Sequence, residues 1–270
     1  MDITFIQATT LPDAWFQCVY RLLKGENVAK HVYQIEQGSY VGQKRIEFDF
    51  AVVQINHPGV EPLIPDIPAQ MQIPPPVESM EYVHNYCAKY LLDDSRLPNE
   101  TYRYSNWLAR GLERVKEHLR QGRNTNQTAI NIGSWLPLEK PSLTDEKNRT
   151  YQALCLDTDA FIDPGTEEHD PACMRLVDFR VDQSDTLHLF VYFRSWDLWS
   201  GFPANLAGLQ LMKFLLAEEL ELQDGKIIAA SKGLHIYDHA YQVAAARVGM
   251  DPTVDLAGFI EFVDQTRKKG

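Results

Sequence analysis

FRSWDLWSGFPANLAG, residues 193–208, carries the pattern that decides the fold. The residues before it alternate in the manner of a strand that ends at Arg194. The residues after it are apolar on nearly every side, which predicts a central buried helix that opens near Pro203 and ends near Leu220. Arg194, Ser195 and Asp197 stand at the end of the strand, and Asn205 stands at the start of the helix. They either complete a tight turn or converge on a ligand.

A second strand precedes this one. Met174–Val181 alternates, Asp182–Asp185 is typical of a turn, and Thr186–Arg194 alternates again, so the sequence predicts a hairpin. One face of the second strand carries Leu187, Leu189, Val191 and Phe193, and the other carries His188, Phe190, Tyr192 and Arg194. We expect the core to cover the first face and a second copy of the chain to cover the second, which predicts a homodimer.

The other segments predict helices and strands in an α+β arrangement. Helices are expected at Leu11–Leu23, Glu78–Leu92, Asn106–Arg120 and Leu256–Thr266. Strands are expected at Ile46–Ile55, Thr128–Ile132, Tyr151–Leu156 and Lys226–Ser231. We interpret residues 1–270 as one domain, with a proline-rich loop at 57–77 and a polar insertion at 137–171.

Charge and composition exclude several classes of protein. The chain has 26 basic and 37 acidic residues, a net charge of -11, which disfavours DNA and anionic membranes as partners. It has no secretory signal and no apolar run of membrane-spanning length, so we expect a cytoplasmic protein. The four cysteines are scattered without metal-ligand spacing, and we expect no metal.

The hairpin would bring Cys173, just before its first strand, next to Arg194 at the end of its second. Taken singly, Cys173 fits a buried core cysteine and Arg194 fits a surface ion pair. Together they are more informative, because a guanidinium favours the nucleophilic thiolate and can also bind phosphate through two hydrogen bonds. The helix start adds N–H donors, and Asn205 offers the donor and acceptor that read the edge of an amide-type ring. These residues indicate a phosphorylated ligand with such a ring.

The same residues resemble a known family. Its sequential signatures match Cys173 after Asp170-Pro171-Ala172, Arg194-Ser195-x-Asp197, Gly201-x-Pro203-x-Asn205 and His235-x-Tyr237. In order and spacing they are similar to thymidylate synthase, specifically from Asp170 to about Ala245, and the form WDLWSGFPANLAG looks more like the archaeal-type members. Upstream, TYRYSNWL is similar to the segment before the family's phosphate-binding arginine pair.

The resemblance implies a fold and a reaction. The fold would be the α+β, three-layer fold of thymidylate synthase, with a twisted mixed sheet at the dimer interface and a central buried helix. The reaction would be reductive methylation of dUMP at C5 to dTMP, with 5,10-methylenetetrahydrofolate as cosubstrate and dihydrofolate as product. A thiolate adduct of Cys173 at C6 of the base would activate C5.

The resemblance also implies a role for each matching residue. Cys173, Arg194 and Asn205 would be catalytic. Arg194 and Ser195 would hold the phosphate, Asn205 would pair with N3 and O4 of the base, His235 and Tyr237 would reach the deoxyribose hydroxyl, and Asp197 and Gly201 would face the folate. Relatives that act on cytosine carry Asp where Asn205 stands, which implies uracil here.

The phosphate-binding pair departs from the family pattern, and one catalytic assignment stays open. Gln127-Thr128 stands where the family carries its phosphate-binding arginine pair, and the cations that could substitute are Lys44, Arg45 and Arg123. The general acid/base glutamate would be either Glu78 or Glu81. Two alternative functions stay open: a dUMP or UMP 5-hydroxymethylase on the same fold, and a nucleotide-binding relative without catalytic activity.

Overall fold

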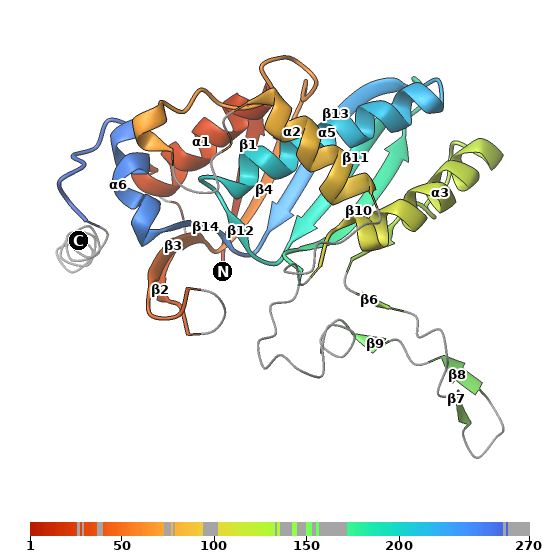
Figure 1. Ribbon diagram of the computed structural model, residues 1–270, viewed down its shortest axis with the longest axis horizontal. Coiled ribbons are helices and arrows are strands. Elements are labelled where there is room, and N and C mark those ends of the chain that lie inside the picture. Colours follow the sequence, from red (N-terminus) through yellow and green to blue (C-terminus); the bar gives the residue numbers. More distant parts are fainter. Residues whose placement is uncertain are drawn as a thin grey trace.

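The computed structural model describes residues 1–25, 28, 30–36, 40–72, 77, 79–93, 102–132, 134–135, 142–144, 150–152, 155–156, 172–255 and 258. Its centre is a mixed six-stranded sheet in the order β1-β4-β13-β11-β10-β5 (Figure 1). The strands are β1 (Ile3–Ala8), β4 (Phe50–Ile55), β13 (Gln223–Ser231), β11 (Thr186–Phe193), β10 (Met174–Val181) and β5 (Ile130–Asn131). The pairs β1/β4 and β11/β13 are parallel, and the other neighbours are antiparallel.

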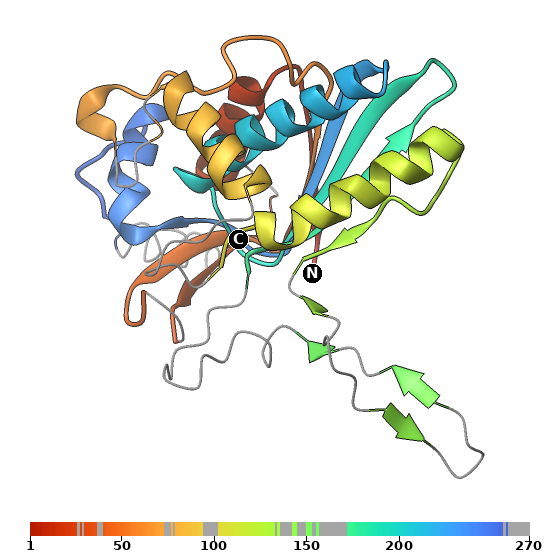
Figure 2. The same cartoon turned by 45° about the vertical axis from the view of Figure 1, so that its right-hand side comes forward.

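Helices pack on one face of this sheet (Figures 1 and 2). They are α1 (Leu11–Lys24), α2 (Met80–Tyr86), α3 (Ser105–Gln121) and α5 (Gly201–Glu219). The predicted buried helix is α5, which contacts α1, α2, β11 and β13. Because it is apolar on nearly every side, its neighbours can enclose it, and 12 of its residues are buried.

The opposite face of the sheet carries a row of apolar side chains. Register places Phe5, Val52, Ala230, Tyr192 and Leu176 on five successive strands. Phe5 is 53% exposed, and the other four are partly exposed. The predicted second face of the 186–194 strand is therefore part of a wider apolar surface, which we call the open sheet face.

A second, four-stranded sheet lies beside the first, in the order β12-β14-β3-β2. Its strands are β12 (Trp196–Asp197), β14 (Leu234–Tyr237), β3 (Lys44–Phe48) and β2 (Lys30–Gln34), and α6 (Asp238–Arg247) follows β14. The strand predicted at Ile46–Ile55 is in fact two strands in different sheets. The break falls at Asp49, whose carboxylate accepts the backbone N–H of Asp2 at 3.0 Å and pairs with His31.

Most other predicted elements are confirmed with shifted bounds. The hairpin, α1, α3 and β13 are present, and the strand at Thr128–Ile132 is the two-residue β5. The helix at Glu78–Leu92 is α2 followed by a π-helical turn, η2 (Cys87–Leu92). A 3-10 turn, η1 (Ala69–Met71), lies within the proline-rich loop. The insertion contains β7 (Ser142–Thr144), β8 (Thr150–Gln152) and β9 (Cys155–Leu156), with β6 (Ser134–Trp135) before it.

Two predictions concern the ends of helices. The central helix begins at Gly201 rather than near Pro203, because the Asp197 carboxylate accepts the backbone N–H groups of Ser200 and Gly201. The helix predicted at Leu256–Thr266 falls outside the described residues, apart from Gly258. Within the described part of the chain, no helix has the length and apolar character to cross a membrane.

Candidate active site

Cys173 and Arg194 are neighbours, as the sequence predicts. Met174 pairs with Phe193 at the end of the β10–β11 hairpin, so the residues just beyond them meet. The backbone N–H of Arg194 donates to the carbonyl of Cys173 at 2.8 Å, and its Nε donates to the carbonyl of Ala172 at 3.3 Å. The hairpin thus fixes the guanidinium stem beside the thiol-bearing residue.

Cys173 is also the most accessible of the cysteines whose side chains are described. Cys18 and Cys87 are buried, whereas Cys173 is partly exposed. Burial raises the pKa of the Cys87 thiol to about 11 and raises that of Cys18 further still. Both remain protonated at neutral pH, so Cys173 is the candidate nucleophile.

Two tyrosines, the partly buried Tyr102 and the buried Tyr104, bond to the backbone at Cys173 and Met174, and sequence reasoning assigned neither. The backbone N–H of Cys173 donates to the Tyr102 hydroxyl at 3.3 Å, and that of Met174 donates to the Tyr104 hydroxyl at 3.3 Å. Burial raises the pKa of both phenols, so they stay neutral. The alternation in TYRYSNWL is a local sign that the two tyrosines act together, but their contact with the hairpin spans about 70 residues of chain.

The Asn205 amide lies in the first turns of α5 and bonds to two other elements. Trp196, in β12, donates its indole N–H to Asn205 Oδ1 at 3.0 Å. Asn205 Nδ2 donates to the Tyr86 hydroxyl, at the end of α2, at 2.7 Å. The predicted base-reading amide is therefore held in one orientation.

Asp197 ends β12, four residues before α5 begins. Its carboxylate accepts the backbone N–H groups of Trp199 at 3.0 Å, Ser200 at 3.2 Å and Gly201 at 3.1 Å. Burial raises the pKa of Asp197, and these three donors oppose the rise. Asp197 therefore orders the turn into α5, and its predicted contact with folate, like that of Gly201, stays a prediction.

His235 is buried on β14, opposite Asp197 in register. Its ring Nδ1 lies 2.8 Å from the carbonyl of Gly233, which fixes the proton on Nδ1. Burial lowers the pKa of His235 to about 3. Nε2 therefore carries a lone pair, and within the described part of the chain it has no hydrogen-bond partner. A ligand hydroxyl would satisfy this acceptor.

Tyr237 and Ser195 complete the cluster. The Tyr237 ring lies edge-on to His235, with centroids 4.4 Å apart. Burial raises the pKa of Tyr237, and the Asp197 carboxylate raises it further. A Cβ on Gly233 would lie 3.0 Å from the Arg194 carbonyl oxygen and 3.4 Å from the Ser195 Cα, so the backbone at Gly233 passes close to the end of β11.

The buried His235 predicts an acid-sensitive fold. The unfolded chain binds a proton at about pH 6.5 and the folded chain only at about pH 3, so the unfolded state binds more protons in that window. The neutral ring makes its full contribution to the free energy of unfolding above pH 6.5. As the pH falls towards 3, the free energy of unfolding decreases by about 4 kcal/mol. Urea unfolding between pH 7 and pH 4 measures this slope. His235→Gln should flatten it and the exposed His84→Gln should not; equal slopes in all three proteins would refute the assignment.

Two of the three cations expected to replace the arginine pair form ion pairs with other residues. Arg45 Nε lies 2.7 Å from Glu47 Oε2, although its charge is close enough to lower the His235 pKa. Arg123 pairs with Asp185 at 2.6 Å, in the turn at the far end of the hairpin. Eight residues of strand span about 25 Å, so Arg123 cannot reach Arg194 within one chain. Lys44 is exposed on β3.

The Gln127-Thr128 pair does not replace the arginines either. Thr128 is 1% exposed, and its hydroxyl lies 2.7 Å from Asp178 Oδ1 and 2.6 Å from the carbonyl of Phe179. Gln127 is exposed. Of the two candidate acids, Glu81 is exposed on α2, and Glu78 lies outside the described residues.

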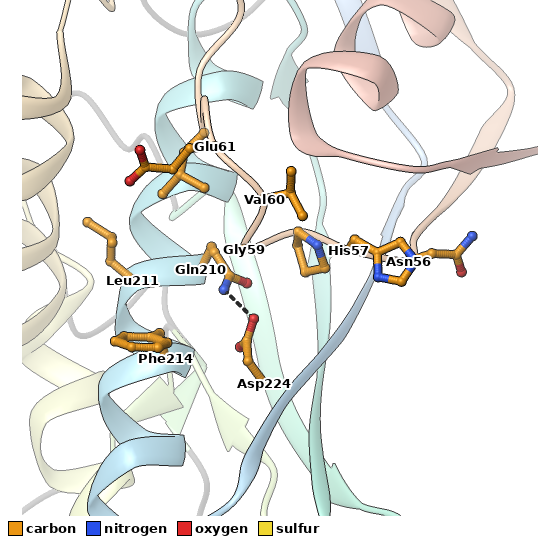
Figure 3. Close-up of a pocket in the computed structure, with 11 residues that line it drawn as sticks. Asn56, His57, Gly59, Val60, Glu61, Gln210, Leu211, Phe214 and Asp224 are labelled. Carbon is orange, nitrogen blue, oxygen red and sulfur yellow. Dashed lines mark hydrogen bonds between the residues drawn. The ribbon is translucent and has the colours of Figure 1, made fainter.

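A cavity of about 440 Å³ lies elsewhere, between the loop after β4 and α5 (Figure 3). Leu63, Leu211 and Phe214 give it apolar walls, and the bonded pair Gln210–Asp224 closes one side. None of the predicted site residues lines it. The described residues include no cluster of three or more metal-ligating side chains.

Comparisons with known proteins agree with this arrangement. The thymidylate synthase family model matches residues 165–257, a range that contains Cys173, Arg194, Ser195, Asp197, Gly201, Asn205, His235 and Tyr237. A protein of Methanococcoides burtonii named "Putative thymidylate synthase" is 32% identical over 153 residues, 52% of this chain and 68% of that protein. A protein of Methanosarcina barkeri with the same name is 30% identical, covering 55% of this chain and 69% of its own length. The thymidylate synthase of Mycoplasma genitalium is 36% identical over 83 residues, 30% of this chain and 29% of its own.

The fold and the site define an α+β protein in which a partly exposed cysteine neighbours an arginine that is followed in the chain by the start of a buried helix. The chain belongs to the thymidylate synthase family and resembles its archaeal-type members.

Proposed function

We propose that the chain is a cytoplasmic thymidylate synthase that converts dUMP to dTMP with 5,10-methylenetetrahydrofolate. The observation that carries the proposal is the contact of Cys173 with Arg194 at the end of the hairpin, next to β12. Trp196 of β12 bonds to Asn205 on α5, and Asp197 of β12 pairs in register with His235 on β14. Cys173, Arg194, Asn205 and His235 supply in turn a nucleophile, a cation for phosphate, a donor and acceptor for the base, and an acceptor for a sugar hydroxyl.

In the proposed reaction, the Cys173 thiolate adds to C6 of the uracil ring and pushes electrons onto O4 as an enolate. C5 of the enolate then attacks the methylene carbon of the cosubstrate and forms the new carbon–carbon bond. Loss of the C5 proton releases the folate nitrogen, and hydride transfer from the folate to the exocyclic carbon yields the methyl group as the thiolate leaves C6. The folate is thereby oxidised to dihydrofolate, and no metal takes part.

The chain's own groups would bind and orient the nucleotide. Arg194 and Ser195 would hold the phosphate at the strand end, where Arg194 is fixed by its bonds to the 172–173 backbone. Neutral His235 would accept the deoxyribose hydroxyl through Nε2, beside Tyr237. Asn205 would read N3 and O4 of the base. Asp197 and Gly201, at the mouth of α5, would face the folate.

The reaction is tested with purified protein, dUMP and methylenetetrahydrofolate. Formation of dTMP together with dihydrofolate, followed by absorbance and by mass spectrometry of the nucleotide, supports the proposal. A 5-hydroxymethyl product with tetrahydrofolate would identify the hydroxymethylase instead. Binding of dUMP with no product at all would favour a non-catalytic relative.

We further propose that one domain, residues 1–270, dimerises through the open sheet face. Soluble monomers seldom expose a continuous apolar row of this kind to water. A two-fold axis would bury the open sheet face of one chain against the same face of its partner. A partner chain could also supply phosphate-binding cations that one chain does not place near Arg194.

Placing a charge in this row should separate the dimer. Tyr192 lies in the middle of the open sheet face, so Tyr192→Glu would bury a carboxylate at the interface and should yield a monomer by sedimentation velocity. Phe214→Glu is the matched control, because Phe214 is 45% exposed on α5, on the helical side of the sheet. A monomeric wild-type protein at micromolar concentration would rule out this interface.

A further inference from the structure

The hydrogen bonds around Asn205 determine which way its amide faces. The indole N–H of Trp196 can only donate, so the atom 3.0 Å from it must be the amide oxygen. The amide nitrogen then faces the Tyr86 hydroxyl at 2.7 Å. Each end of the amide keeps one bonding position: a lone pair on Oδ1 and an N–H on Nδ2.

The free lone pair on Oδ1 and the free N–H on Nδ2 match uracil better than cytosine. Uracil presents a donor at N3 and an acceptor at O4, which complement Oδ1 and Nδ2 in the observed orientation. Cytosine presents an acceptor at N3 and a donor at its exocyclic amine, the reverse order. An asparagine amide can read cytosine only after a half-turn that exchanges its oxygen and nitrogen.

We propose that Trp196 is a positioning residue that prevents this half-turn and thereby makes the site select uracil over cytosine. The proposal rests on the proposed function, in which Asn205 reads the base. A turned amide would point its NH2 group at the indole N–H, and two donors facing each other away from water cost free energy. The Tyr86 hydroxyl can either accept or donate, so it tolerates both orientations.

The indole is held firmly enough to act in this way. Trp196 is 2% exposed and lies between two aromatic rings, Phe193 at 4.1 Å and Phe202 at 4.5 Å between centroids. Its strand pairs with β14 through Leu234. The N–H therefore cannot swing away to accommodate a turned amide without breaking this stack.

Dissociation constants of dUMP and dCMP, measured by calorimetry without folate, test the proposal. Trp196→Phe keeps an aromatic ring in the stack and removes the N–H. We expect the ratio of the dCMP constant to the dUMP constant to fall by about tenfold or more. Tyr86→Phe should weaken dUMP binding and leave the ratio nearly unchanged. Tyr90→Phe, which removes a neighbouring hydroxyl bonded to the Tyr102 carbonyl, should change neither.

A second replacement guards against loss of the fold. Site-specific incorporation of 3-benzothienylalanine at position 196 keeps the bicyclic ring and lacks the N–H, and it should lower the ratio as Trp196→Phe does. If the wild type binds dUMP and both replacements leave the ratio unchanged, or weaken both nucleotides equally, Trp196 is only structural and the proposed function stands. If the wild type binds neither nucleotide, the inference and the proposed function both fail.

Discussion

Cys173→Ser is expected to lower kcat/KM for thymidylate formation by at least about four orders of magnitude. Serine keeps nearly the same size at the start of β10 but is scarcely ionised at neutral pH, so the adduct at C6 cannot form. The chemical step has no comparable route without that adduct. Steady-state assays with dUMP and methylenetetrahydrofolate measure the loss, and calorimetry should show that dUMP still binds.

Covalent trapping separates a missing nucleophile from a damaged fold. 5-Fluoro-dUMP with the folate should add its mass to the wild-type chain, with the modified peptide containing Cys173, and should add nothing to Cys173→Ser. Cys87→Ala is the matched control, because burial raises the pKa of that thiol to about 11 and it should not react. A Cys173→Ser protein that retains turnover or forms the adduct would disprove the proposed mechanism.

The part of the site that could be predicted from sequence is the part set by local patterns. Alternation over 174–181 and 186–194 places Cys173 beside Arg194, and the structure confirms that contact. The apolar run after residue 203 predicts a buried helix, which is α5. In each case one segment contains the whole signal, since strand alternation and helix periodicity are short-range properties.

Contacts between distant segments could not be predicted in this way. Tyr86 lies 119 residues from Asn205, and Tyr102 lies 71 residues from Cys173, yet each bonds to it. No local pattern encodes these pairs. The break between β3 and β4 at Asp49 was not predicted for the same reason, because the Asp49 carboxylate contacts His31, which lies in β2. The position of Arg123 also depends on a contact between distant segments: its ion pair with Asp185 keeps it away from the candidate site.

Asp224→Ala is expected to lower the free energy of unfolding by about 3–5 kcal/mol, although it lies outside the candidate site. Lys213, on α5, is 0% exposed, and its ammonium group lies 3.0 Å from Asp224 Oδ1 and donates to the Gly225 carbonyl. Asp224 also accepts from Gln210 Nε2 at 2.8 Å (Figure 3). Alanine would leave a buried cation without its counter-ion and a buried amide without its acceptor. Urea unfolding at pH 7 measures the loss.

The pH dependence of the variant's stability tests whether the buried Lys213 cation causes the loss. Burial lowers the pKa of Lys213, and the Asp224 charge opposes that shift, so the variant's lysine should lose its proton more readily. In the alkaline range the unfolded chain then binds more protons than the folded chain, and the variant's stability should rise with pH more steeply than that of the wild type.

Removing both charges in Lys213→Met/Asp224→Leu should restore most of the stability, because no unpaired ion remains. Glu219→Ala, which breaks exposed pairs with Lys116 and Arg120, should cost far less. If Asp224→Ala lost no more stability than Glu219→Ala, the Lys213 ammonium would not depend on this carboxylate.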